Sequence, residues 1–278
     1  MSALANAQRL ENLRTVQILT VLLVILTAVA AAAGLFIPGV YRDNDWVAPQ
    51  NRGFDLCTLV LLPVISVTLI FVRRGSARAS MILAGMLGYV FYTYTGGVFA
   101  YAFNQFYLVY LAIFSLSIAA LVAIAAGVDA EALKRKFDAS TPHGPVVGYL
   151  SLMAFLLSLL WLSRVIPALL AGTVPEDVIK TGAPTSFVFT MDLGLVVPLT
   201  ALAAVWLWRR KAWGYFLTGV MLLKYTTMGL ALVAASWYAH TQGVPTPVEL
   251  LGSYGMIALG GIGMSAWFFR HCRDRSEA

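Results

Sequence analysis

Long apolar stretches, separated by short polar segments, make up most of this sequence. Each stretch is close to or above the ~20 residues that an α-helix needs to cross ~30 Å of hydrocarbon. The pattern therefore predicts an all-α integral membrane protein with eight transmembrane helices. The predicted helices are residues 16–40, 55–72, 79–102, 104–128, 146–172, 185–208, 212–239 and 248–269.

Positive charge is distributed unevenly among the polar segments. Fourteen of the nineteen Lys and Arg residues form five clusters, which alternate with loops that hold Arg42, Arg52 and Lys180. Lys and Arg accumulate in cytoplasmic loops, so both termini are predicted to be cytoplasmic, in a plasma membrane or a bacterial inner membrane. The clusters are Arg9/Arg14, Arg73/Arg74/Arg78, Lys134/Arg135/Lys136, Arg209/Arg210/Lys211 and Arg270/Arg273/Arg275.

The composition leaves no room for a soluble domain beside eight helices, because 60% of the 278 residues are hydrophobic and 12% are charged. The formal net charge is +6, which in a soluble protein would suggest a nucleic-acid partner. Here the cations lie at predicted cytoplasmic helix ends. We therefore expect contact with anionic membrane lipid and no binding of nucleic acid.

The second half of the sequence repeats features of the first in the same order. The offsets between matched features are 129, 137, 136 and 133 residues, which predicts a duplication of four helices. The two parallel repeats would be residues 1–128 and residues 146–278, the second with a short cytoplasmic tail, joined by a cytoplasmic linker of residues 129–145. The matched features are Ile37-Pro38 with Ile166-Pro167, Asp55 and Pro63 with Asp192 and Pro198, Arg73-Arg74 with Arg209-Arg210, and Tyr92–Gly96 with Tyr225–Gly229.

Five charged residues lie within the predicted helices or at their outer ends: Arg164, Asp192, Lys224, Asp55 and Glu249. A charge in hydrocarbon is costly unless it is paired or hydrated, so such residues are candidates for function. At 1.5 Å per residue, Asp192 lies about 25 Å and Lys224 about 20 Å above the cytoplasmic edge. Arg164 lies about 12 Å below the outer end of its helix. The five charges therefore predict one site in the outer half of the membrane.

Aromatic residues are concentrated between Tyr89 and Tyr110 in the first half. Part of this run fits the aromatic belt found where membrane proteins meet the lipid headgroups. Another part fits a cavity wall, because tyrosines supply hydroxyl groups beside flat apolar surfaces. We assign Tyr92, Tyr94 and the matched Tyr225 to such a wall.

The buried charges allow two interpretations. In the first, Asp192 and Lys224 form an ion pair that fixes helix packing, and Arg164 reaches the outer headgroups. In the second, Arg164 joins the pair and leaves an excess positive charge. That excess would favour an anionic or zwitterionic ligand, because Arg matches the geometry of carboxylate and phosphate groups.

Motifs that would name a reaction are missing from the sequence. It contains no P-loop, HExxH, CxxC or GxSxG, so an enzyme is the less favoured class. The histidines His143, His240 and His271 lie in loops or at helix ends, and we expect no metal site and no cofactor. A disulfide between Cys57 and Cys272 would have to cross the membrane.

The leading hypothesis is a polytopic membrane protein that binds a small anionic or amphipathic ligand from the extracytoplasmic side, with transport of that ligand as an extension. The alternative is an accessory subunit or membrane sensor whose buried charges are structural. A weaker alternative is an intramembrane enzyme acting on lipid, with Asp192 as general base. Small residues at Ala258, Gly261 and Ser265 fit either packing within the chain or contact with a second copy or a larger membrane complex.

Overall fold

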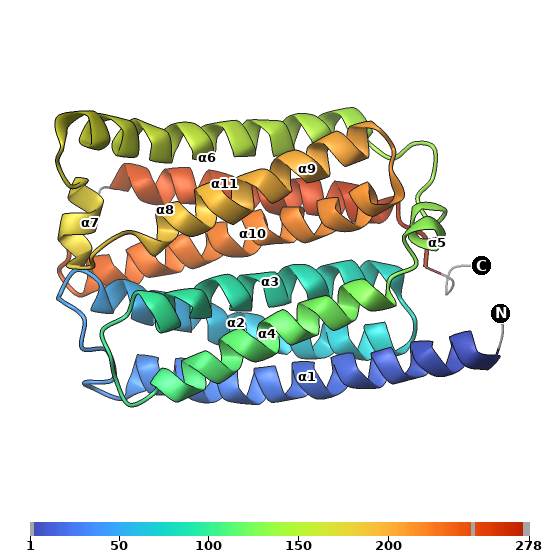
Figure 1. Ribbon diagram of the computed structural model, residues 1–278, viewed down its shortest axis with the longest axis horizontal. Coiled ribbons are helices and arrows are strands. Elements are labelled where there is room, and N and C mark those ends of the chain that lie inside the picture. The colour runs from blue at the N-terminus through green and yellow to red at the C-terminus, as the bar shows by residue number, and fades with distance from the viewer. Residues whose placement is uncertain (1–2, 246–247, 275–278) are drawn as a thin grey trace.

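The computed structural model describes residues 3–245 and 248–274, and every regular element in those ranges is helical. The long helices run roughly side by side along the longest axis of the molecule (Figure 1). They are α1 (Ala3–Phe36), α2 (Ala48–Arg73), α3 (Ala77–Phe99), α4 (Tyr107–Gly127), α6 (His143–Ala171), α10 (Ala212–Thr241) and α11 (Val248–Arg270). A further continuous helix consists of α8 (Phe187–Met191), the π-helical turn η1 (Asp192–Val196) and α9 (Val197–Trp208). The short helices are α5 (Ala130–Lys134) and α7 (Glu176–Thr181).

Seven helices in the described residues are long and apolar enough to cross a membrane. This confirms an all-α fold of the integral membrane class. The helix α11, with 23 residues, corresponds to the eighth predicted crossing, and the count of eight remains a prediction. The seven spans are Glu11–Phe36, Ala48–Arg73, Ala77–Phe99, Tyr107–Gly127, His143–Ala171, Phe187–Trp208 and Ala212–Thr241.

The first helix ends four residues before the predicted boundary of residue 40. It stops at Phe36 because Pro38 has no N–H group with which to continue the helical hydrogen bonds. Gly39 then turns the chain with a φ of 76°, a backbone conformation that glycine adopts without steric cost. The loop that follows carries Tyr41 back over the end of the first helices, where it becomes part of a polar cluster.

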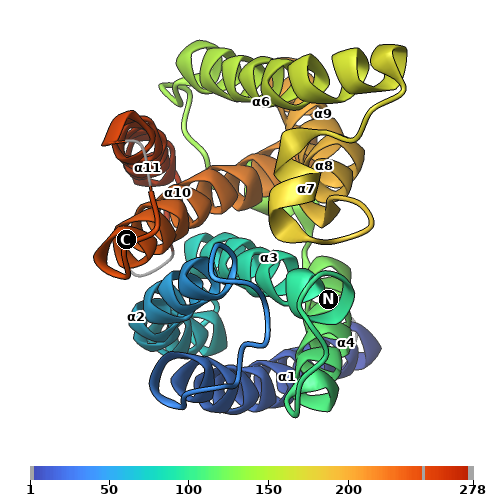
Figure 2. The ribbon, with the colours of Figure 1, turned by 90° about the vertical axis from the view of Figure 1, so that its left-hand side faces the viewer.

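The helices form two groups (Figure 2). In the first group α1, α2, α3 and α4 pack in a closed ring, since α4 also packs along α1. The second group contains α6, α9, α10 and α11, but here α6 and α11 scarcely touch. The helix α10 packs against α2 and α3 and so joins the groups. The second group is therefore more open than the first.

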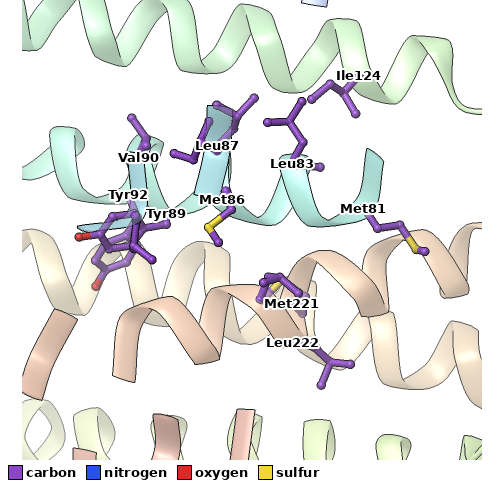
Figure 3. Close-up of a cluster of buried hydrophobic side chains, with 14 of the residues drawn as sticks. Met81, Leu83, Met86, Leu87, Tyr89, Val90, Tyr92, Ile124, Met221 and Leu222 are labelled. Atoms are coloured by element: carbon purple, nitrogen blue, oxygen red, sulfur yellow. The ribbon is translucent and has the colours of Figure 1, made fainter. Parts of the chain in front are cut away.

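The buried core lies where the two groups meet, between α3 and α10. Met86, Tyr89 and Tyr92 on α3 point toward the helix that carries Met221 and Leu222 (Figure 3). By contrast, α6 keeps large apolar side chains exposed, among them Leu169 and Leu170. In a membrane protein such an exposed apolar surface is the surface that contacts lipid tails.

The small residues of α11 face α10. A Cβ atom placed on Gly261 would lie 2.8 Å from the backbone nitrogen of Thr226, so the two helices approach too closely for a larger residue. Ser265 and Thr226 share a hydrogen bond of 3.3 Å. This face is therefore used for packing within the chain, as small residues are in membrane bundles generally.

The start of α1, the end of α11 and the short helix α5 lie at one end of the molecule, and α7 lies at the other (Figure 1). At the first of these ends, the segment after α11 connects the two groups. Asp274 accepts hydrogen bonds from Ser76 and from the backbone N–H of Ala77 at the start of α3. His271 lies 3.0 Å from Asp138, and hydrogen bonds from Ser140 and His271 lower the pKa of the Asp138 carboxyl.

Candidate ligand site at Asp192 and Lys224

The carboxylate of Asp192 is buried between three helices. The Tyr92 hydroxyl on α3 donates a hydrogen bond of 2.9 Å to Oδ1, and the Trp161 indole N–H on α6 donates one of 2.8 Å to Oδ2. Only 7% of Asp192 is exposed. Each carboxylate oxygen therefore has a donor, and the residue connects the second helix group to the first.

The ammonium group of Lys224 contacts the same tyrosine from α10. Its Nζ atom lies 3.7 Å from the centroid of the Tyr92 ring, a distance suited to a cation–π interaction. Lys224 is 7% exposed, and within the described residues its Nζ has no hydrogen-bond acceptor and no direct ion pair. Asp192 and Lys224 influence each other electrostatically and share Tyr92, rather than forming a direct salt bridge.

A π-helical turn positions Asp192. The turn η1 begins at Asp192 and ends two residues before Pro198. Such a turn inserts one residue into a helix, rotates the residues before it relative to those after it, and is often found at functional sites. Residues of α8 support the two donors, because the Phe187 ring lies 6.1 Å from Tyr92 and the Phe189 ring lies 5.0 Å from Trp161.

Arg164 does not contact the Asp192 carboxylate, whose hydrogen bonds come from Tyr92 and Trp161. Its guanidinium group forms an ion pair with Asp177 on α7, which supplies the balancing carboxylate. The same group lies 5.6 Å from the Trp161 ring, so Trp161 contacts Arg164 as well as Asp192. Arg164 is exposed because its long side chain extends toward the end of the molecule where α7 folds back.

Asp55 and Tyr94 lie in the first helix group, apart from Asp192. The Tyr41 hydroxyl donates a hydrogen bond of 2.6 Å to Asp55 Oδ2, and the Tyr94 hydroxyl lies 3.5 Å from the backbone oxygen of Thr27. The single site that the sequence predicts is therefore divided into two clusters, one in each helix group.

Tyr225 and Glu249 do not donate to the Asp192 carboxylate, whose hydrogen bonds come from Tyr92 and Trp161, although the Asp192 charge acts on Tyr225. The Tyr225 hydroxyl shares a hydrogen bond of 3.0 Å with Thr200, and its ring contacts Tyr149 of α6 at 6.4 Å. Tyr149 thereby bridges part of the space between α6 and the rest of the second group. Glu249 is exposed in the first turn of α11.

A separate surface hollow of about 290 Å³ lies beside α5. The hollow is lined by two lysines, two tryptophans and two further residues. They are Lys134, Lys211, Trp206, Trp213, Glu131 and Ala212. Lysine beside tryptophan is typical of a membrane–water interface, so this hollow fits the expected contact with anionic lipid.

Within the described part of the chain, no group of His, Cys, Asp or Glu side chains has the arrangement of a metal site. The chain matches no protein-family model, and comparisons with curated proteins and with solved structures find no significant similarity.

Proposed function

We propose that this protein is an eight-helix membrane protein that binds a small anionic or amphipathic ligand from the extracytoplasmic side, with Lys224 as the anchor for the negative charge. One observation carries the proposal. Lys224 is a buried residue whose ammonium group has three N–H donors and no hydrogen-bond acceptor among the described residues, and its Nζ atom lies over the face of Tyr92.

The chemistry of the cluster supports an anionic ligand. An ammonium group in an apolar environment is stabilised by an acceptor, and leaving it without one is costly. The oxygens of Asp192 already accept hydrogen bonds from Tyr92 and Trp161. A carboxylate or phosphate group of a ligand would give Lys224 a charge-assisted hydrogen bond. The neighbouring rings of Phe187 and Tyr92 suit an apolar chain attached to that group.

The architecture supports entry of an amphipathic molecule. The helices α6 and α11 scarcely touch, whereas the corresponding α1 and α4 pack along each other. A chain of contacts runs inward from Asp177 on α7 through Arg164 and Trp161 to Asp192. Transport of the ligand would follow if the second helix group moved against the first.

Charge and sequence matches support the orientation and the repeat. The clusters of Lys and Arg occur after every second helix, so α5 would be cytoplasmic and α7 extracytoplasmic. Hydrogen bonding favours Tyr89, in place of the Tyr92 of the sequence match, as the counterpart of Tyr225: the two are 136 residues apart, as are Arg73 and Arg209. In each half the tyrosine shares a hydrogen bond with a threonine of the preceding long helix. These matches favour two parallel four-helix repeats, residues 1–128 and 146–278, joined by a cytoplasmic linker.

Thermal unfolding in phosphatidylcholine nanodiscs tests the proposal with defined probes. Decanoate should raise the melting temperature, whereas decanol and decyltrimethylammonium should not, because only decanoate carries an anion. Lys224→Met should remove the decanoate response, and Lys180→Met, which alters an exposed lysine of α7, should keep it. A decanoate response that survives Lys224→Met, or an equal response to decanol, would contradict the proposal.

A second candidate is an accessory subunit or sensor in which the buried charges serve packing alone. The observation that favours it is the complete hydrogen bonding of Asp192. In that case Asp192→Asn and Lys224→Met would lower the melting temperature, and none of the three probes would shift that of the wild-type protein.

A further inference from the structure

A second buried polar cluster surrounds Asp55 in the first helix group. Asp55 is 5% exposed and Tyr41 is 7% exposed, and the Tyr41 hydroxyl donates a hydrogen bond of 2.6 Å to Asp55 Oδ2. Burial, with the neighbouring Asp55 charge, raises the pKa of Tyr41 well above its usual range, so this phenol keeps its proton. A Cβ atom on Gly34 would lie 2.1 Å from Asp55 Oδ2, so glycine is needed there for the carboxylate to fit.

Several buried polar atoms around this carboxylate have no hydrogen-bond partner among the described residues. They include the hydroxyl group of Tyr110, a residue that is 1% exposed, and the Oδ2 atom of Asp43. Tyr94 packs beside them: its hydroxyl donates a hydrogen bond of 3.5 Å to the Thr27 backbone oxygen, and its ring lies 5.8 Å from that of Tyr110. Asp55 is close enough for its charge to act on both phenols. Buried polar atoms in proteins are almost always satisfied, so these oxygens indicate a ligand or ordered water.

The charges around the cluster leave one negative charge in excess. Asp55 has no ion pair among the described residues. Arg52 lies three residues before Asp55 on α2 and acts on its charge without forming an ion pair with it. The neighbouring loop adds Asp43, whose charge acts on Tyr110, so these three side chains carry one excess negative charge. An excess buried charge is costly in a membrane. One positive charge would make the cluster neutral.

We propose that Asp55 and the hydroxyl oxygens around it bind a small monovalent metal cation of the Na⁺ class. Hard cations prefer oxygen ligands, and this cluster offers a carboxylate with the hydroxyls of Tyr41, Tyr94 and Tyr110. Tyr41 donates a hydrogen bond to Asp55, and its hydroxyl oxygen still has lone pairs for a cation. A single carboxylate with neutral oxygens suits one positive charge better than two.

The cation site goes beyond the proposed anion site and shares no residue with it. The residues of the cation cluster lie on α2, α3, α4 and the loop between α1 and α2, whereas Lys224 lies on α10. The protein could therefore have either site without the other. The variant Asp55→Asn tests the cation site, and the variant Lys224→Met tests the anion site.

The test compares thermal unfolding in nanodiscs with LiCl, NaCl, KCl or choline chloride at equal ionic strength. At least one alkali cation should raise the melting temperature above its value in choline, in wild type and in Lys224→Met. Asp55→Asn should remove that difference. Gly34→Ala should remove it too, because the added methyl group would occupy the space beside Asp55 Oδ2.

Equilibrium binding of radioactive Na⁺ provides a second readout if Asp55→Asn does not fold. Wild type should bind Na⁺ saturably, and Tyr41→Phe should bind it roughly tenfold more weakly, the effect of losing about one hydrogen-bonding oxygen. Equal melting temperatures in all four salts together with no saturable Na⁺ binding would overturn the proposal. A melting temperature that depends on pH and not on the cation would also overturn it, because Asp55 would then hold a proton.

Discussion

At the scale of single residues, Tyr92 and Trp161 determine how the buried acid is held. Sequence patterns identify Asp192, Lys224 and Tyr92, because charges and hydroxyl-bearing rings in apolar helices are unusual. They do not identify Trp161, since a tryptophan in a membrane helix is commonly an interfacial residue. Trp161 is 31 residues from Asp192 in the sequence, and Tyr92 is 100 residues from Asp192. No local pattern encodes such pairings.

Arg164 is a second residue whose side-chain contacts the sequence does not predict. Its depth agrees with that of the buried charges, and depth along a helix is readable from the sequence. The direction of the Arg164 side chain cannot be determined from the sequence. It depends on the ion pair with Asp177 on α7, a short helix whose position follows from tertiary packing.

Removing either donor to Asp192 should destabilise the protein. Tyr92→Phe keeps the ring beneath Lys224 but removes the hydroxyl, and Trp161→Phe removes the indole N–H. Each leaves a buried carboxylate oxygen without its donor, which costs about 1–3 kcal/mol. Thermal unfolding in detergent should show a lower melting temperature for each variant. Tyr107→Phe is the control, because Tyr107 makes no hydrogen bond from its side chain to a described residue. Wild-type stability in both site variants would contradict the hydrogen bonds.

At the scale of elements, the π-helical turn sets the rotation of Asp192 relative to α9. Sequence analysis predicts a helix over 185–208 and correctly places Pro198 within it. It does not predict that the helix widens over Asp192–Val196, because the widening depends on what the carboxylate meets on α3 and α6.

Inserting one alanine after Val196, at the start of α9, should rotate Asp192 relative to α9. One additional residue in a regular helix rotates the residues before it by about 100° relative to those after it, so Asp192 would lose Tyr92 and Trp161. We expect a lower melting temperature and loss of the decanoate response. Gly194→Ala is the matched control, because a Cβ atom there meets no neighbouring atom within 4 Å. If the insertion variant behaves like Gly194→Ala, the rotation of Asp192 relative to α9 does not position the site.

At the scale of the whole molecule, the helices were predictable and their packing was not. A bilayer requires about 20 apolar residues for each crossing, so the pattern of hydrophobic positions predicts the spans closely. Lipid tails and neighbouring helices are equally apolar, and hydrophobicity does not distinguish the faces they contact. The close packing of α10 on α2 and α3 and the slight contact between α6 and α11 are therefore learned from the structure.

The predicted orientation can be checked by reporter fusions. Fusions after Asp138 and Lys211 should report a cytoplasmic location, and fusions near Asp45 and Thr181 should report an external one, because the Lys and Arg clusters favour the cytoplasmic side. The reverse pattern at any two of these positions would contradict the topology and with it the extracytoplasmic access to the site.

The central claim is that Lys224 anchors an anion, and equilibrium binding of radioactive decanoate to the protein in phosphatidylcholine nanodiscs tests it most directly. We predict saturable binding of one decanoate per chain in wild type and in Asp55→Asn. Lys224→Met should bind roughly tenfold more weakly or worse, because a charge-assisted hydrogen bond contributes about 1.5–3 kcal/mol. Binding of equal strength in Lys224→Met and wild type would contradict the claim, as would the absence of saturable binding in wild type.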